Sequence, residues 1–298
     1  MTVDTAKPQT IREVMSVAGG WLTERGIEEA RLDTEVLLAH ALGVPRLSLY
    51  LDHDRPLRPE ELGRFRSLMK RRAAREPVAY IVGQRGFFGL DLEVGPGVLV
   101  PRPETEHLVE VGFEELKRIV GAGRAAPRFV DVGTGSGCVA LALVSEAKKG
   151  AVAPDLSGLM SDVSAEALAI AGRNAAACGL ARQVSLLRGH LLAAVADGSL
   201  DLVLSNPPYV TPAEESLLAP EILDHEPRGA LFDAEGLPLT AALVRDAARV
   251  LRPGGALALE TGFDKADLVA SFFEAAGFRE VRRVRDLGGH ERVVVGRR

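Results

Sequence analysis

The sequence contains very little cysteine. Only two of its 298 residues are cysteines, Cys138 and Cys178, and they lack the spacing of a metal site. A disulfide framework is therefore not supported, and this usage is typical of proteins from a reducing compartment. The chain also lacks an uncharged apolar run of membrane-spanning length and, near its start, the apolar core of a secretion signal. We therefore expect a cytoplasmic protein that does not bind membranes.

Positive charge is not in excess either. The formal net charge is −5 at pH 7, whereas a dedicated nucleic-acid-binding protein usually carries a basic surface. This balance argues weakly against DNA as a direct partner, although it leaves room for a local basic patch. Hydrophobic residues make up 47% of the chain, which is enough for a sizeable core, and the length fits one large or two modest domains.

Two hydrophobic patterns divide the chain. Residues 10–75 have the spacing of short amphipathic helices, with Thr10 placed to cap the first helix and Pro59 to open the third. The first helix is expected to bury a face made of Ile11, Val14, Met15, Val17 and Leu22. From Arg128 onward, short apolar runs alternate with helical segments, which is typical of an α/β domain with a parallel sheet.

The α/β pattern predicts seven strands. They lie near 128–132, 157–161, 183–188, 200–205, 254–260, 280–285 and 291–296, with helices at 138–148, 164–178, 237–251 and 265–276. The last two strands are expected to be antiparallel, because the connection between them is too short for a helical crossover.

Three further segments have an informative composition. Residues 79–102 contain short apolar runs split by Gly and Pro, which predicts a hairpin-like connector. A basic cluster forms either a solvated helix face or a docking patch for an acidic or RNA-associated partner. Its members are Lys70, Arg71, Arg72 and Arg75. Residues 211–235 are predicted to form a long loop, and a loop of this length usually carries function.

A predicted strand runs into a glycine-rich turn at residues 129–137. Its glycines allow a tight backbone turn and the close approach of a ligand. Cys138 occupies the position of the third glycine in a dinucleotide-binding fingerprint, and the turn lacks the Gly-Lys-Ser/Thr end of a P-loop. The turn therefore fits a ligand without phosphate, whose amino-acid part and sugar lie against the glycines. The alternative is a tight turn that binds nothing.

The next two strand ends carry candidate binding residues. Asp162 ends the second strand of the predicted sheet, where a carboxylate can accept both hydroxyls of a ribose. Helix capping is the alternative, because Asp162 and Ser164 precede a predicted helix, and the two roles are compatible. His190 and Leu191 follow the third strand, at the edge where an adenine is expected. His190 is not expected to bind metal, because no partner His or Cys lies at ligand spacing.

The run Asn206-Pro207-Pro208-Tyr209 follows an apolar strand that the two prolines terminate. In an open parallel sheet, ligands bind at this edge. A planar NH2 group is a poor nucleophile because its lone pair is delocalised. The Asn206 side-chain oxygen and the Pro207 carbonyl can each accept one N–H and direct the lone pair towards an electrophile, while Tyr209 stacks on the flat group. A proline-rich turn without a ligand is the alternative.

Several motifs together carry a resemblance to a known family. They occupy residues 31–38, 76–83, 88–90, 101–106, 205–209, 226–227, 260–262 and 286–292. With them, the chain resembles class I S-adenosylmethionine-dependent methyltransferases that act on planar nitrogens. More closely, it resembles the HemK/PrmC family, which methylates a glutamine side-chain amide in class I peptide-chain release factors. The run Pro101-Arg102-Pro103-Glu104-Thr105-Glu106 is the most discriminating of these motifs.

The resemblance implies an α/β fold, namely a class I methyltransferase Rossmann-like seven-stranded sheet with a small N-terminal helical domain and a β-hairpin connector. It divides the chain into a helical bundle for release-factor docking (1–76), the hairpin connector (77–103) and an S-adenosylmethionine-dependent catalytic domain (104–298). The reaction would be methyl transfer to the amide nitrogen N5 of the glutamine in the release factor's Gly-Gly-Gln motif, with S-adenosyl-L-homocysteine as the second product.

The resemblance also assigns the site residues. The implied cofactor-binding residues are Asp131, Gly133, Thr134, Gly135, Ser136, Gly137, Asp162, His190, Leu191 and Asn206. The implied substrate-binding residues are Arg102, Thr105, Asn206, Pro207, Pro208 and Tyr209, of which Asn206, Pro207 and Tyr209 would be catalytic. No metal is implied. The family usually has Asp where this chain has His190, which changes the polar contact expected for the adenine amino group.

Three other functions are compatible with parts of the pattern. A glutamine methyltransferase of a ribosomal protein has a similar architecture, but the intact run at 101–106 argues against it. A DNA adenine-N6 methyltransferase would use the same tetrapeptide, and the negative net charge and the absence of a target-recognition domain argue against that. A non-catalytic module that only binds a release factor would not need intact glycine and Asn-Pro-Pro-Tyr motifs.

Overall fold

The computed structural model describes residues 9–298, so most of the segment 1–10, for which no signal core is expected, lies outside the described part. Two compact units divide the chain. The helical unit holds the described chain up to Gly83 together with Ala219–His225, and the sheet unit holds Gln84–Leu218 and Glu226–Arg298. The predicted functional division at residues 76 and 103 is not tested by this partition and stays a prediction.

The helical unit is built from short helices around a leucine-rich core. Its helices are α1 (Ile11–Thr23), α2 (Ala30–Leu42), α3 (Ser48–Leu51), α4 (Pro59–Ala73), α5 (Val78–Val82) and α9 (Pro220–His225). Thr10 caps α1 as predicted, in a capping box with Glu13. Leu22, Leu37 and Leu38 are fully buried in the core.

Two details of this unit differ from the expectation. Val17 is half-exposed rather than buried, because the buried face of α1 follows Ile11, Val14, Ala18 and Leu22 at three- and four-residue spacing. Residues 78–82 were expected in the hairpin connector but form α5, which packs on α2 and α4 and buries Tyr80.

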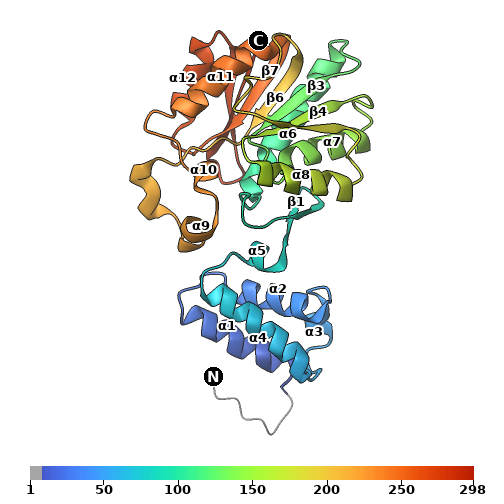
Figure 1. The fold of residues 1–298 in the computed structure, drawn as a ribbon, viewed down its shortest axis with the longest axis vertical. Helices are drawn as coiled ribbons and strands as arrows, with labels where there is room; N and C mark the ends of the chain where they lie inside the picture. The colour runs from blue at the N-terminus through green and yellow to red at the C-terminus, as the bar shows by residue number, and fades with distance from the viewer. Residues whose placement is uncertain (1–8) are drawn as a thin grey trace. The chain divides into compact units, whose positions relative to one another are not determined.

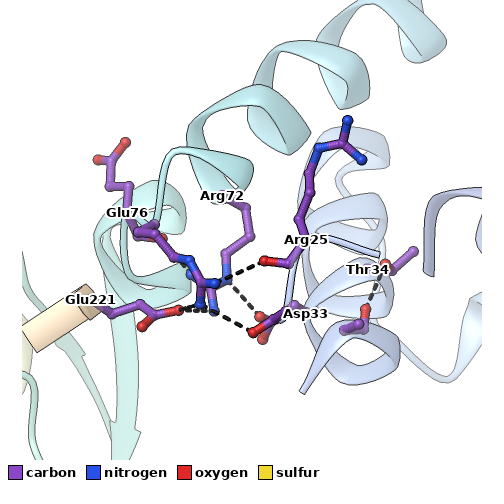
Figure 2. Close-up of polar contacts among 9 residues, drawn as sticks. Arg25, Asp33, Thr34, Arg72, Glu76 and Glu221 are labelled. Carbon is purple, nitrogen blue, oxygen red and sulfur yellow. Dashed lines mark hydrogen bonds and ion pairs between the residues drawn. The ribbon is translucent and has the colours of Figure 1, made fainter. Parts of the chain in front are cut away.

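The basic cluster at the end of α4 is neither a solvated face nor a docking patch at its central member. Arg72 is only 6% exposed and lies between two carboxylates (Figure 2). Its Nε donates to Asp33 Oδ2 at 2.6 Å, and its Nη2 donates to Glu221 Oε1 at 2.9 Å. Arg75 donates to the same oxygen of Glu221 at 3.2 Å. These arginines therefore attach α9 to the helical unit.

The segment that supplies Glu221 was expected to be a loop. Instead, residues 211–235 contain three short helices, η2 (Pro212–Leu217), α9 and α10 (Arg228–Leu231). Only α9 belongs to the helical unit, whereas the chain on either side of it belongs to the sheet unit.

The sheet unit contains a two-stranded hairpin and a seven-stranded sheet. The hairpin pairs β1 (Gln84–Phe87) with β2 (Leu90–Glu93). The sheet strands are β3 (Arg128–Val132), β4 (Ser157–Asp162), β5 (Val184–Arg188), β6 (Leu200–Ser205), β7 (Leu251–Glu260), β8 (Arg279–Arg285) and β9 (Glu291–Arg297). Their order is β5-β4-β3-β6-β7-β9-β8, and β9 runs antiparallel to both of its neighbours. All seven predicted strands are present, and the expected antiparallel pair at the end is confirmed.

Helices cover both faces of the sheet (Figure 1). On one face lie α6 (Glu106–Gly121), which follows η1 (Pro103–Thr105), α7 (Cys138–Lys149) and α8 (Ala165–Ala177); on the other lie α11 (Pro238–Val250) and α12 (Ala266–Ala275). Side chains of β3 alternate between the two cores, with Phe129 in one and Val130 in the other. Among the described residues, no helix combines the length and apolar character needed to cross a bilayer.

The strand order places the candidate residues at one edge. Because β3, β4, β6 and β7 are mutually parallel where they pair, their carboxyl ends meet there. The chain leaves β3 towards β4 on one side and continues from β6 to β7 on the other, so the β3–β6 pair is a topological switch point. Ligands of open α/β sheets bind at such a point.

Candidate active site

The glycine turn lies directly after β3 and is held by Asp131. This carboxylate is 1% exposed, and its Oδ2 accepts hydrogen bonds from Thr134 Oγ1 at 2.6 Å and from Ala140 N at 3.3 Å. Burial raises the pKa of Asp131 to about 6. Gly133 and Gly135 have φ angles of +69° and +55°, and a Cβ on either would meet nothing within 4 Å. Glycine is therefore needed there for backbone conformation, and the turn leaves open space beside it.

Asp162 connects the second strand to this turn. Its Oδ2 accepts from Gly135 N at 3.0 Å, and its Oδ1 accepts from Ser164 N at 2.9 Å. Ser164 is the residue that caps α8, with its hydroxyl accepting from Ala167 N. Each Asp162 oxygen has a further lone pair, so the carboxylate can still accept from a ligand hydroxyl.

A cavity of about 480 Å³ opens beside these groups, within the size range of small-molecule sites. It brings together most of the predicted site residues. On its wall are Arg102, Thr105, Asp131, Gly133, Thr134, Gly135, Ser136, Asp162, His190, Leu191, Asn206, Pro207 and Pro208. Gly137 and Tyr209 are the two predicted residues that do not line it. Gly137 instead is the N-cap residue of α7, and a Cβ on it would lie 3.1 Å from Met160 Sδ and 3.3 Å from Leu141 Cδ1.

Asn206 presents one side of its amide to the protein. Its Nδ2 donates to Thr105 Oγ1 at 3.2 Å, and Thr105 is almost fully buried at the start of α6. Within the described chain, no group donates a hydrogen bond to Asn206 Oδ1 or to the Pro207 carbonyl. Two oxygen acceptors at this strand end therefore remain available to a ligand.

Tyr209 lies behind the cavity wall. Its ring packs against the core on the α11 and α12 side of the sheet, and its hydroxyl donates to Glu260 Oε1 at 3.5 Å. Burial raises the pKa of this phenol well above its usual range. The predicted stacking of Tyr209 on a flat substrate group is not tested by these contacts and stays a prediction.

Arg102 is held by a buried carboxylate. Its Nη2 donates to Glu226 Oε1 at 2.6 Å, and Glu226 Oε2 also accepts from Val100 N at 3.4 Å. Glu226 follows α9, so a residue distant in sequence fixes the run at 101–106 beside the cavity. Gly97 also lines the cavity. It lies so close to Glu166 that a Cβ on it would be 2.6 Å from Glu166 Cδ.

Glu260 is the carboxyl group at this sheet edge whose pKa is shifted furthest, and the sequence alone assigned it no role. Glu260 ends β7, is 2% exposed, and burial raises its pKa to about 7. Its position was accessible from the sequence, because a carboxylate that follows an apolar strand lies at the same edge as Asp162. The sequence could not show its neighbours Thr105 and Tyr209. Across the described residues, no group of three or more His, Cys, Asp or Glu side chains could hold a metal ion.

Comparison with known proteins identifies the family. Two family models match, the PrmC N-terminal domain over residues 13–83 and the Methyltransferase small domain over residues 115–231. The release factor glutamine methyltransferase of Geobacter sulfurreducens is 42% identical over 296 residues, which covers 98% of this chain and 99% of the relative. The enzyme of the same name from Nitratidesulfovibrio vulgaris is 42% identical over 293 residues, with 97% and 95% covered.

Solved structures agree on the fold. The hMettl16 catalytic domain, crystallised with an RNA hairpin, matches with a TM-score of 0.52 at 16% identity and covers 70% of this chain and 76% of its own. At this identity the likeness concerns the fold alone, a class I methyltransferase sheet. The nearly full-length sequence relatives decide the family: the chain belongs to the release factor glutamine methyltransferases.

Proposed function

We propose that this chain transfers a methyl group from S-adenosylmethionine to the side-chain amide nitrogen of the glutamine in the Gly-Gly-Gln motif of class I release factors. The observation that carries the proposal is the pair of available acceptors, Asn206 Oδ1 and the Pro207 carbonyl, at the carboxyl end of β6. They belong to the wall of the same cavity that the glycine turn lines. A primary amide has two N–H donors, which this pair matches in number and chemistry.

The cavity residues fit the methyl donor. The turn at Gly133 and Gly135 leaves space against the backbone, and Asp162 retains acceptor capacity for the hydroxyls of a ribose. His190 and Leu191 lie on the wall after β5, where the adenine is expected. When bound, S-adenosylmethionine supplies an electrophilic methyl group on a sulfonium.

The residues of the chain act mainly by positioning. Asn206 Oδ1 and the Pro207 carbonyl each accept one N–H of the glutamine amide, which fixes the plane of the NH2 group and exposes its lone pair on one side. The same acceptors stabilise the positive charge that develops on the nitrogen, as preorganised dipoles do in other active sites. The nitrogen would bond to the methyl carbon as the carbon–sulfur bond breaks and leaves a neutral thioether. It would then lose a proton to solvent, so no base is needed at the start.

The helical unit is the proposed docking element for the release factor. Support comes from the family model of the PrmC N-terminal domain, which matches residues 13–83. We further propose that the protein works in the cytoplasm, and that neither DNA nor a membrane is a direct partner.

Mass spectrometry of acceptors tests this function. The protein would be incubated with S-adenosylmethionine and, in parallel, a purified class I release factor, the same factor with its Gly-Gly-Gln glutamine replaced by alanine, ribosomal proteins, and a DNA oligonucleotide. One added methyl group on the glutamine of the intact factor, and none on the alanine variant, is the expected result. Methylation of a ribosomal protein or of adenine, with the release factor unmodified, would overturn the proposed substrate.

A further inference from the structure

Asn174 is a buried amide whose two N–H donors and whose oxygen all have partners. It lies on α8 and is 1% exposed. Its Oδ1 accepts from Glu93 N at 2.7 Å, and its Nδ2 donates to Glu93 O at 3.0 Å and to Ser136 O at 2.8 Å. The two carbonyls can bind only the NH2 side of the amide and the N–H only its oxygen side, so these partners fix the orientation of the amide.

One partner of Asn174 belongs to the glycine turn. Ser136 lies between Gly135 and Gly137 and is on the wall of the cavity. Both neighbouring glycines have positive φ angles, +55° and +84°, and glycine leaves the backbone more conformational freedom than any other residue. Among residues 9–298, Asn174 is the only group that donates a hydrogen bond to the Ser136 carbonyl. Asn174 therefore restrains the turn between its last two glycines.

The other partner leads to a different part of the cavity wall. Glu93 ends β2, and the segment 94–102 follows it. The residues of this segment that line the cavity are Gly97, Val98, Leu99, Pro101 and Arg102. The same helix meets the segment again through Glu166, which lies beside Gly97. One residue of α8 therefore connects two parts of the cavity wall that are distant in sequence.

We propose that Asn174 is a positioning residue for the methyl donor, because it holds the glycine turn and the segment 94–102 in place before the donor binds. This inference rests on the donor site proposed at that turn, and it does not depend on which acceptor is methylated. A cavity that is already ordered binds its ligand without the entropic cost of fixing two segments. Loss of the amide would leave the buried Ser136 carbonyl unpaired and release the end of β2.

Arg173 provides a matched control on the same helix. Its Nε and Nη2 bind the Glu93 carboxylate at 2.9 Å and 2.7 Å, and both side chains of this pair are about half-exposed. Within the described part of the chain, Arg173 forms no hydrogen bond with the glycine turn. Arg173→Ala therefore weakens the attachment of the hairpin to α8 and leaves the bond to Ser136 in place.

Calorimetry with S-adenosyl-L-homocysteine tests the proposal. Asn174→Asp keeps an acceptor for Glu93 N but turns an oxygen towards the two carbonyls, whereas Asn174→Ala removes all three hydrogen bonds without adding a charge. We expect both variants to bind about 10-fold more weakly than wild type, as for the loss of a buried hydrogen bond, and Arg173→Ala to stay within about twofold of wild type. Unchanged affinity in both Asn174 variants, or an equal loss in Arg173→Ala, would overturn the proposal.

Steady-state kinetics separate positioning of the donor from a general loss of structure. In Asn174→Ala, KM for S-adenosylmethionine should rise about 10-fold, while kcat at saturating donor and KM for the release factor stay within about twofold of wild type. A fall in kcat with an unchanged KM for the donor would contradict the proposal, because the defect would then lie outside donor binding.

Amide hydrogen exchange gives a readout that does not depend on activity, and its first part needs only the wild type. In the free wild type, residues 133–137 should exchange slowly before any donor is added. Asn174→Ala should speed exchange in both 133–137 and 94–102, whereas Arg173→Ala should leave 133–137 unchanged. Residues 279–297 in β8 and β9 serve as the internal reference. Rapid exchange of the turn in the free wild type, or faster exchange of the reference in Asn174→Ala, would count against the proposal.

These measurements also keep the inference distinct from the proposed function. A wild type that binds S-adenosyl-L-homocysteine but methylates no release factor would overturn the proposed acceptor and leave the role of Asn174 intact. A wild type that does not bind S-adenosyl-L-homocysteine would overturn the donor site and this role together. Methylation of the release factor with equal donor affinity in wild type and Asn174→Ala would overturn the role of Asn174 alone.

Discussion

Glu115 and Glu260 are two equally buried glutamates at opposite extremes of charge compensation. Glu115 lies on α6 and is 1% exposed, and Glu260 at the end of β7 is 2% exposed. Burial raises the pKa of Glu115, but hydrogen bonds from Arg297, Arg118 and Arg282 outweigh it and bring the value to about 2. Burial dominates at Glu260, and its pKa rises to about 7.

The partners account for much of this difference. Three arginines join Glu115 to β8, β9 and the end of its own helix, so this charge serves the fold. Glu260 accepts a hydrogen bond from the Tyr209 hydroxyl and forms no ion pair within the described residues, although the charge of Arg292 acts on it from beyond ion-pair distance. In this unit Glu115, with three arginine partners, therefore serves the fold, whereas Glu260, which has no ion pair within the described residues, lies at the site.

The largest expected effect is at Asn206, which follows β6 at the same sheet edge as Glu260. Asn206→Ala removes an acceptor used in the transition state, and we expect a loss of about 2.7–4 kcal/mol of transition-state stabilisation, by analogy with the loss of one oxyanion-hole contact. Calorimetry of S-adenosylmethionine binding separates this loss from an effect on the cofactor, because the resemblance also places Asn206 among the cofactor-binding residues. Near-normal turnover would show that Asn206 does not hold the reacting amide.

Glu115→Gln should affect stability and leave catalysis alone. It leaves three arginine side chains without their carboxylate, and we expect a loss of about 3 kcal/mol in the free energy of unfolding, because these arginines keep part of their hydration. Because the pKa of Glu115 is lowered in the folded protein, its contribution to the free energy of unfolding depends on pH. The stability from Glu115 is fully present above pH 4.5 and is lost as the pH falls towards 2.

Denaturant titration at pH 7 and pH 3 measures both parts of this prediction. The gap between wild type and Glu115→Gln should shrink at the lower pH, while kcat of the folded variant stays near wild type. A lower kcat under conditions in which Glu115→Gln is fully folded would show that Glu115 contributes to catalysis as well as to stability.

How much the sequence could predict follows from how local each feature is. The seven strands and the turn at Gly133 and Gly135 depend on short-range patterns, and they were predicted. The Arg72 network joins residues 33, 72 and 221, so composition alone suggested an exposed basic patch. Glu260 was visible as a strand-end carboxylate, but its burial and its contact with the Tyr209 hydroxyl depend on the fold.

Glu260→Gln should stabilise the protein in a pH-dependent manner. The folded state holds a proton on Glu260 up to about pH 7, and the unfolded state releases it near 4.5, so wild-type stability falls as the pH rises between these values. Arg292, Glu104 and Tyr209 are the charged and titratable groups that act on this carboxyl besides its burial.

The neutral glutamine removes this cost. We expect a gain of about 2 kcal/mol over wild type at pH 8 and almost none at pH 4.5. Chemical denaturation at the two pH values measures the gain. A constant difference between the variants at both values would show that Glu260 carries its ordinary charge in the folded protein, and the contrast with Glu115 would fail.

The smallest effect is expected at Glu221, which lies between the two extremes. It shares Arg72 with Asp33, and burial raises the pKa of Asp33 even though the Arg72 hydrogen bond opposes the rise. Arg72 therefore does not fully offset the burial of Asp33, whereas Arg72 and Arg75 together lower the pKa of the half-buried Glu221 despite its desolvation. Glu221→Ala removes this second carboxylate, and we expect a loss of about 1.5 kcal/mol in the stability of the helical unit, as for a hydrogen bond to a charged group.

Limited proteolysis of residues 211–235 would report the same contact, because α9 is attached to the helical unit through Arg72 and Arg75. Faster cleavage in Glu221→Ala is expected. Glu215→Ala is the matched control, since its pair with Arg228 is exposed on both sides and should contribute less than about 1 kcal/mol. Equal cleavage rates in the two variants would show that the pairs of Glu221 with Arg72 and Arg75 contribute no more stability than an exposed surface pair. Pairing with as many arginines as Glu115 has would then be needed for a glutamate to stabilise the fold.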